Sequence, residues 1–341
     1  MKSLQVRLAS RPVGEPKAEN FDVAEAELPG ITDGQLAVRV IWLSLDPYMR
    51  GRMSDARSYA TPVGIGEVMT GGTVAQVVAS KHPKFQDGDF VLGMFGWQSH
   101  AVSDGVGLRK LDPAHAPLST AVGVLGMPGL TAYVGLLDIG EPKEGETVVV
   151  SAASGAVGSV VGQLAKIKGA RAVGVAGSAE KVAYVTEQLG FDACVSHRSD
   201  TLRDDLKAVC PNGIDVYYEN VGGATLDAAL SLMNPFGRIP VCGMISQYNA
   251  TTLAEGPSRS QLMRQILTDR LKIQGFIVTD RYDRLKAFLE EVGGYIRDGR
   301  LIYKEDITQD LENAPEAFMG LLQGRNFGKL LVQVSEDPTR G

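Results

Sequence analysis

The chain has 341 residues, of which 44% are hydrophobic and 22% charged, and its formal net charge is −6. At roughly 150 residues per domain, this length predicts about two domains, each with a substantial core. The acidic balance and the absence of any Lys/Arg-rich block argue against a nucleic-acid partner.

The three cysteines, Cys194, Cys210 and Cys242, have neither metal-ligand spacing nor the framework of a disulfide-rich secreted domain. The segment MKSLQVRLASRPVGEP at the N-terminus lacks the apolar core of a signal peptide, and no apolar run is long enough to span a membrane. We therefore expect a cytoplasmic protein without a membrane partner.

Residues 1 to about 126 are predicted to be rich in β-strands. The segments LQVRLA, QLAVRVIWLSL, GGTVAQVVAS and GDFVLGMFGW alternate or run apolar between Gly, Pro and Asp residues. From about residue 127, strands alternate with helices. Strands are expected at 147–152, 171–176, 193–196, 214–219, 237–242 and 271–278, and a long helix near 281–298.

This alternation of six strands with helices predicts a doubly wound parallel sheet. After about residue 310, a helix at 311–323 and a strand at 328–334 close the chain. A cleft between the β-rich domain and the α/β domain is the expected place for an active site.

The segment AASGAVG (152–158) follows a Val-Val-Val run and precedes a predicted helix at about 156–168. It resembles the Gly-x-Gly-x-x-Gly fingerprint with alanine first. Gly155 would let the backbone approach a pyrophosphate, and Gly158 would let the helix pack close to the strand. The helix points its free N–H groups at the phosphates. An ordinary tight turn of another α/β protein is the alternative.

The next strand ends at Gly177-Ser178, without the acid that accepts hydrogen bonds from the adenosine ribose in NAD-binding proteins. A carboxylate there would repel a 2′-phosphate. Gly177 instead leaves room, Ser178 offers a hydroxyl, and Lys181 brings a positive charge one helical turn later. Arg198 is a second candidate cation. We therefore expect NADPH rather than NADH, unless Lys181 is only a solvated surface lysine.

Eight motifs, the turn AASGAVG among them, together indicate one family. They are LSLDPYMRGRM (43–53), GEVMTGGTVAQVV (66–78), GMPGLTAY (126–133), AASGAVG (152–158), YYENVGG (217–223), CGMISQYN (242–249), QGFIV (274–278) and NFGK (326–329). Nearly end to end, the chain resembles the zinc-independent medium-chain dehydrogenases/reductases of the leukotriene B4 dehydrogenase/prostaglandin reductase type.

This resemblance implies an α/β protein of two domains. A GroES-like β-rich catalytic domain would span 1–126 and be completed by 310–341, and a Rossmann NADPH-binding domain would span 127–309. The implied activity is NADPH-dependent reduction of the C=C bond of α,β-unsaturated ketones and aldehydes, including curcumin-like or prostaglandin-like enones. The implied assembly is a homodimer.

The resemblance also implies the cofactor-binding residues. The phosphate turn falls on Gly155, Ala156, Val157 and Gly158, and the 2′-phosphate lysine on Lys181. The nicotinamide end falls on Asn220, on the loop Cys242, Gly243, Met244, Ile245, Ser246, Gln247 and Tyr248, on Phe276, Ile277 and Val278, and on Asn326, which closes over the cofactor. The chain departs from the family at His197, where the mammalian members have a tyrosine near the adenosine phosphate. His197 and Arg198 could still bind a 2′-phosphate.

No metal is expected. Zinc-dependent relatives surround an open metal position with a Cys, a His and a further Cys or carboxylate. Here His82, His100, His115 and His197 are scattered, and no cysteine precedes Cys194. Hydride addition from NADPH to an activated C=C bond needs no Lewis acid.

Hydride addition does need a hydrogen-bond donor at the developing enolate oxygen. Tyr248 is the catalytic candidate, together with the nicotinamide-ribose hydroxyl. A tyrosine that only shapes the substrate pocket is the alternative. Tyr59 is a weaker candidate for the substrate wall, and an ordinary loop tyrosine is its alternative.

Met127 is expected under the nicotinamide, with a gap-filling methionine as the alternative. For Arg50 and Arg52 we favour structural ion-pair roles over lining the cleft. Two other functions stay open for the whole chain. One is an NADPH quinone oxidoreductase of the same superfamily, and the other is a non-catalytic NADPH-binding sensor or structural protein.

Overall fold

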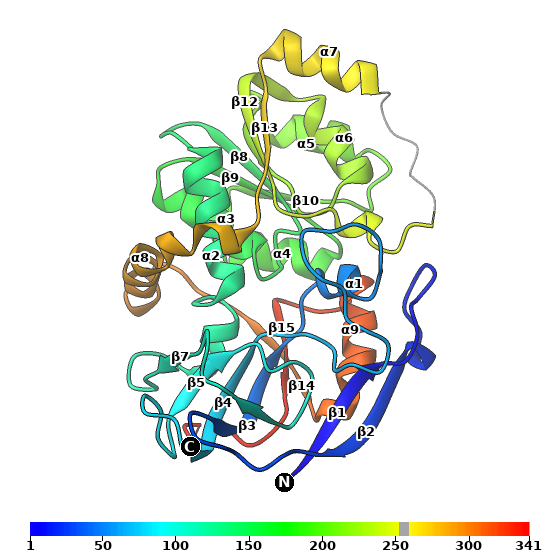
Figure 1. The fold of residues 1–341 in the computed structure, drawn as a ribbon. Coiled ribbons are helices and arrows are strands. Elements are labelled where there is room, and N and C mark those ends of the chain that lie inside the picture. The colour runs from blue at the N-terminus through cyan, green and yellow to red at the C-terminus, as the bar shows by residue number, and fades with distance from the viewer. Residues whose placement is uncertain (252–258, 341) are drawn as a thin grey trace. The chain divides into compact units, whose positions relative to one another are not determined.

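The computed structural model describes residues 1–251 and 259–340, and the chain divides into two compact units. One unit is Met1–Gly126 with Glu305–Gly341, and the other is Met127–Lys304 (Figure 1). The chain returns to the first unit at Glu305 rather than at the predicted residue 310, because β14 (Glu305–Gln309) pairs with β15 (Lys329–Gln333) of that unit. No helix in the described ranges is long and apolar enough to cross a membrane.

The first unit is built on a seven-stranded sheet in the order β14-β15-β3-β4-β5-β7, with β6 paired to β3. A separate antiparallel pair holds β1 and β2. The strands are β1 (Lys2–Leu8), β2 (Phe21–Glu27), β3 (Leu36–Ser44), β4 (Thr73–Ser80), β5 (Phe90–Gly93), β6 (His100–Ser103) and β7 (Arg109–Leu111). The α-helices are α1 (Met49–Arg52) and α9 (Ala314–Leu322), and the 3₁₀ turns are η1 (Ala18–Asn20), η2 (Leu118–Val122) and η6 (Leu311–Asn313). The prediction that this part is β-rich is confirmed.

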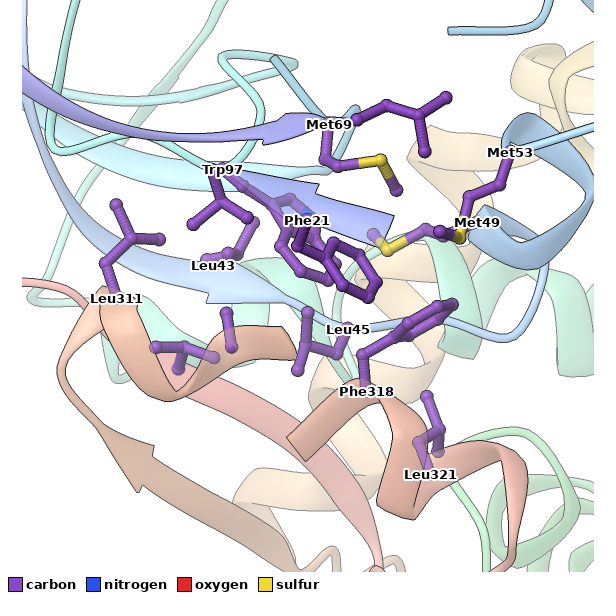
Figure 2. Packing of buried hydrophobic residues seen from close by; sticks show 14 of the residues in the cluster. Phe21, Leu43, Leu45, Met49, Met53, Met69, Trp97, Leu311, Phe318 and Leu321 are labelled. Carbon is purple, nitrogen blue, oxygen red and sulfur yellow. The ribbon is translucent and has the colours of Figure 1, made fainter. Parts of the chain in front are cut away.

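A buried aromatic cluster joins the two ends of the chain within the first unit (Figure 2). The ring of Phe21 stacks on Trp97 with centroids 5.8 Å apart, and Phe318 of α9 meets the Trp97 ring edge-on at 5.6 Å. Met49, Met53 and other apolar side chains surround these rings. Since burying each aromatic ring contributes about 1.5–3 kcal/mol, this cluster explains why the C-terminal segment folds back onto the N-terminal strands.

The second unit is a six-stranded parallel sheet in the order β10-β9-β8-β11-β12-β13. Its strands are β8 (Thr147–Ser151), β9 (Arg171–Ala176), β10 (Ala193–Ser196), β11 (Ile214–Tyr218), β12 (Met233–Val241) and β13 (Lys272–Gly275). The order reverses between β8 and β11, which is the switch point at which such sheets bind ligands. The predicted Rossmann-type sheet is therefore present.

Helices cover both faces of this sheet. Apolar residues of α5, α6 and α7 form one core with Val149, Val173 and Tyr217, while α2 packs against both α3 and α8. The helices are α2 (Met127–Val134), α3 (Gly158–Ile167), α4 (Ala179–Glu187), α5 (Leu202–Val209), α6 (Gly223–Leu230), α7 (Arg259–Asp269) and α8 (Leu285–Arg297). A π-helical turn, η3 (Gly135–Gly140), extends α2, and the 3₁₀ segments are η4 (Ile245–Gln247) and η5 (Val278–Arg284).

Four predicted strands, those corresponding to β8, β9, β10 and β11, match the structure to within a residue. The predicted strand 271–278 is too long, because β13 ends at Gly275 and residues 278–284 form η5. For the same reason α8 begins at Leu285 rather than near 281. Helix α3 begins at Gly158 rather than at 156, because the preceding residues form the turn.

Candidate active site

The turn between β8 and α3 has the shape of a phosphate-binding loop. Ala152 adopts a left-handed conformation with φ of +52°, at the position where the fingerprint has its first glycine. A Cβ on Gly158 would collide with the Ala152 carbonyl, and one on Gly155 would lie 3.2 Å from the same oxygen. The predicted residues Gly155, Ala156, Val157 and Gly158 thus lie together at the N-terminus of the ten-residue helix α3. Free N–H groups at such an end bind anions.

The end of β9 collects basic side chains. Ser178 caps α4, since its Oγ accepts a hydrogen bond of 3.2 Å from the Lys181 N–H. The His197 N–H donates to the Ala176 carbonyl at 2.9 Å, which aligns the end of β10 with the end of β9. Partial desolvation, then the positive charges of Arg198 and Lys181, lower the pKa of His197. The structure therefore brings the predicted 2′-phosphate residues together around Gly177.

The carboxyl ends of β8 and β11 are joined by a buried glutamate that the sequence analysis missed. Glu219 is 1% exposed, and its Oε1 accepts hydrogen bonds from the Val221 and Gly222 N–H groups at 2.6 and 2.9 Å. The same oxygen accepts from the Ser151 and Tyr217 hydroxyls at 3.1 and 3.2 Å. We call these five residues the Glu219 network. Burial raises the pKa of the Glu219 carboxyl.

The signal for this network was visible in YYENVGG, where an acid directly follows two aromatic residues of a buried strand. Gly222 and Gly223 both have positive φ, of 78° and 57°, so the turn exposes successive N–H groups to a single acceptor. Turns of this kind bind anions. Here the acceptor is the chain's own Glu219 carboxyl, which fixes the turn in place.

Asn220 lies inside this arrangement. Its backbone N–H donates to the Ser151 Oγ and its side-chain Nδ2 to the Ser151 carbonyl, both at 2.8 Å. The side chain therefore ties the end of β11 to the end of β8, at the switch point of the sheet.

The loop after β12 folds onto the same strand end. Cys242 and Gly243 donate their N–H groups to the Glu219 carbonyl, and Ser246 donates both its N–H and its hydroxyl to the Val221 carbonyl. Tyr248 then turns back, so that its hydroxyl accepts a long hydrogen bond of 3.4 Å from the Met244 N–H. The predicted loop Cys242–Tyr248 is thus held by the Glu219 network. Burial raises the pKa of the Cys242 thiol to about 12, so this cysteine is a neutral group.

Phe276 packs against the start of the second unit. Its ring meets Tyr218 edge-on with centroids 6.5 Å apart, and a Cβ on Gly135 would lie 2.7 Å from it. Ile277 follows, and Val278 is buried at the start of η5. Met127 begins α2, where its carbonyl accepts a hydrogen bond from the Thr131 hydroxyl.

Two predicted site residues, Tyr59 and Asn326, belong to the first unit. Tyr59 is 59% exposed and lies 4.6 Å from the guanidinium of Arg52. The Asn326 Nδ2 donates to the Gly328 carbonyl at 2.9 Å. Arg50 donates to the Gly14 carbonyl at 2.8 Å.

A buried ion pair that the sequence analysis missed lies in the first unit, where Lys329 donates to Asp46 and to the Leu45 carbonyl at 2.9 and 2.8 Å. Both side chains are nearly inaccessible to solvent. This pair fixes β15 to the end of β3. Within the described ranges, no group of three His, Cys, Asp or Glu side chains is placed to hold a metal ion.

Comparisons with known proteins agree with this arrangement. Residues 4–111 match a family model described as the N-terminal domain of oxidoreductase, and residues 156–293 match one described as zinc-binding dehydrogenase. The chain is 54% identical to NADPH-dependent curcumin reductase of Escherichia coli (strain K12), over 97% of this chain and 96% of the relative. It is 45% identical to prostaglandin reductase 1 of Rattus norvegicus, over 94% of this chain and 95% of the relative.

A crystal structure of CurA in complex with NADPH from Vibrio vulnificus has the same fold, with a TM-score of 0.95 at 53% identity. The similarity covers 98% of this chain and all of that one. At this identity and coverage, both units of the chain have counterparts in the relative.

Proposed function

We propose, from the premise that the chain belongs to the medium-chain dehydrogenase/reductase family, that it reduces the C=C bond of α,β-unsaturated ketones and aldehydes with NADPH. The observation that carries this proposal is the 54% identity to NADPH-dependent curcumin reductase over 97% of the chain. The protein is thus an oxidoreductase, and its substrate class is the small-molecule enones, curcumin-like or prostaglandin-like.

The residues of the second unit fit NADPH. The N–H groups of Gly155, Ala156, Val157 and Gly158 would hold the pyrophosphate at the start of α3. Lys181, His197 and Arg198, with the Ser178 hydroxyl, would hold the 2′-phosphate. The absence of an acid at the end of β9 removes the group that would repel this phosphate.

The nicotinamide end would be held by Asn220, by the loop Cys242–Tyr248, by Phe276, Ile277 and Val278, and by Met127 and Asn326. When bound, NADPH supplies the hydride that adds to the β-carbon of the enone. The Glu219 network fixes two of these segments by hydrogen bonds to backbone groups. A preorganised site of this kind has little reorganisation left to undergo during the reaction.

Tyr248 is the proposed catalytic residue. Its hydroxyl accepts from the Met244 N–H, so its own hydrogen is directed away from that contact. Donated to the carbonyl oxygen of the substrate, this hydrogen stabilises the negative charge that develops there, by about 3–4 kcal/mol for a well-placed donor. Tyr59 is proposed to form part of the substrate wall, since its ring is exposed and supported by Arg52.

The function is tested by steady-state NADPH oxidation on a panel of enones and alkenals beside a panel of quinones. We expect turnover of enones to dominate, with the hydrogen from C4 of NADPH recovered at the β-carbon. Quinone turnover far above enone turnover would instead identify a quinone oxidoreductase. Tight NADPH binding without turnover of any electrophile would identify a sensor or structural protein.

The reaction is proposed to be independent of zinc. The described residues offer no cluster of three ligands, and hydride addition to an enone needs no Lewis acid. Exhaustive dialysis against a chelator should therefore leave turnover unchanged. A loss of turnover that zinc restores would contradict the proposal.

A cytoplasmic location is proposed from the free cysteines Cys194, Cys210 and Cys242, which suit a reducing compartment.

A homodimer is proposed through the open edge of the second unit's sheet. Strand β13 is the edge strand, all four of its residues are exposed, and no other strand of the described ranges pairs with its outer side. The exposed apolar side chains Ile273, Met263 and Leu267 lie on β13 and on α7, the helix before it. An open edge beside apolar side chains is a surface that pairs readily with another copy.

A further inference from the structure

We propose that His197 determines cofactor specificity by binding the 2′-phosphate of NADPH as an imidazolium, so that NADPH binding takes up a proton and NADH binding does not. The inference rests on the proposed NADPH site at the end of β9 and adds a proton linkage to it. It makes the preference for NADPH over NADH depend on pH.

The first observation is the position of the imidazole. The His197 N–H is bound to the Ala176 carbonyl at 2.9 Å, so the residue is fixed beside the last residue of β9. Its Nε2 lies 3.0 Å from the place where a Cβ on Gly177 would be. The ring therefore lies along the strand end at which NAD-binding proteins of this fold carry their ribose-binding acid. His197 is exposed, which leaves the ring accessible to a ligand.

The second observation is the charge around the ring. Two charged groups change the pKa of His197, and both are cations. They are Arg198, the next residue in the sequence, and Lys181 on α4. The carboxylate of Asp205 on α5 is engaged by the Ser199 and Thr201 hydroxyls. Ser196 and Gly177 contribute only a hydroxyl and a backbone carbonyl, which bond to each other at 3.3 Å. The positive charges of Arg198 and Lys181 thus act on the imidazole from two sides of the chain, from its own segment and from α4.

In the free protein, these surroundings oppose protonation of the ring. Partial desolvation and the fields of Arg198 and Lys181 lower the pKa of His197 below its ordinary value of 6.5. The imidazole is therefore neutral at neutral pH. A dianionic phosphate in contact with the ring reverses the local field, and an opposite charge at this range typically raises a histidine pKa by about 1–3 units.

The sign of the linkage follows directly. Because the pKa of His197 is lower in the free protein than in the NADPH complex, the ring gains a proton on binding at any pH between the two values. Within that window the NADPH affinity falls as the pH rises, by at most about tenfold per pH unit. NADH lacks the 2′-phosphate, so its affinity stays constant across the same window.

The phosphate has a titration of its own, with a pKa of about 6, which acts in the opposite direction. Above about pH 7 this group is already dianionic, so any proton uptake there belongs to the protein. Measurements between pH 7 and 8 therefore isolate the histidine.

The test is calorimetric titration of the purified protein, free of nucleotide, with NADPH and with NADH. Titrations at one pH in two non-phosphate buffers of different ionisation enthalpy give the number of protons taken up. We expect uptake of about half a proton per NADPH near pH 7 in the wild type, and none with NADH. His197→Asn should abolish the uptake, weaken NADPH binding severalfold and leave NADH binding unchanged. His115→Asn is the matched control, because His115 is an exposed histidine of the first unit.

Equal uptake in His197→Asn and wild type, or no uptake in the wild type between pH 7 and 8, would overturn the inference. If His197→Asn fails to fold, the imidazole C2–H resonance of His197 in the wild type decides the question. That resonance should titrate below pH 6.5 in the free protein and above it with NADPH. Calorimetry needs no enone. Proton uptake by the protein on NADPH binding, without turnover of any enone, would therefore refute the proposed function and leave this inference standing.

Discussion

At the scale of single residues, Tyr248 carries the catalytic hypothesis. Tyr248→Phe keeps the ring and removes the hydroxyl, so it separates hydrogen-bond donation from pocket shape. Losing a donor to a developing oxyanion typically costs about 10²–10³ in kcat. We expect a fall of this order in single-turnover NADPH oxidation with a saturating enone, with an unchanged Kd for NADPH. A kcat equal to that of the wild type would reduce Tyr248 to a wall of the pocket. Tyr295→Phe serves as the control, since it removes a hydroxyl that bonds Glu291 on α8, outside the proposed site.

Ala152 is a strained residue in the phosphate loop. Its φ of +52° costs an L-residue about 1–2 kcal/mol, a cost that glycine avoids. Glycine also adds about 0.4–1 kcal/mol of unfolded-state entropy, so Ala152→Gly should stabilise the fold by up to about 1 kcal/mol. Urea unfolding measures the change, and NADPH binding should persist. Ala153→Gly is the matched control: that alanine is fully buried without a positive φ, so its loss should destabilise. A loss of stability in both variants would show that Ala152 is not strained.

At the scale of elements, the Glu219 network joins β8, β11 and the loop after β12 through one carboxylate. Burial raises the pKa of Glu219. Its contribution to stability is therefore complete below the unfolded-chain pKa of about 4.3 and is lost as the pH rises through the higher folded-state value. Each unit of elevation corresponds to about 1.4 kcal/mol.

Glu219→Gln removes this titration and keeps an oxygen acceptor. We expect the free energy of unfolding of the wild type, minus that of Glu219→Gln, to decrease as the pH rises from about 4 towards neutrality. Urea unfolding at a series of pH values gives this difference, and Glu187→Gln, on the exposed face of α4, gives the background. A difference that increases with pH would mean that the bonds from Val221 and Gly222 outweigh desolvation and favour the carboxylate.

The elements also show what a sequence can predict. Strands β8 and β9 were predictable because burial on both faces demands continuous runs of apolar residues, as in the Val-Val-Val run of β8. The end of β13 was not, because a short exposed edge strand carries no such pattern. The segment YYENVGG showed an acid after a buried strand, but it did not specify the partners of Glu219, two of which are backbone N–H groups of the turn that follows. The ion pair of Lys329 with Asp46 joins residues far apart in sequence, and only the folded sheet brings them together.

At the scale of the whole molecule, the proposed homodimer depends on the edge at β13. Ile273 on that strand is 38% exposed, and a dimer formed across the edge would bury it beside its own copy. Ile273→Lys would then place two like charges close together in the interface, where such a pair costs several kcal/mol. We expect the wild type to be dimeric and Ile273→Lys to be largely monomeric when measured by size-exclusion chromatography with light scattering. Val106→Lys, at an 80% exposed apolar position of the first unit, should remain dimeric. A dimer that survives Ile273→Lys would place the interface elsewhere, and a monomeric wild type would refute the proposed assembly.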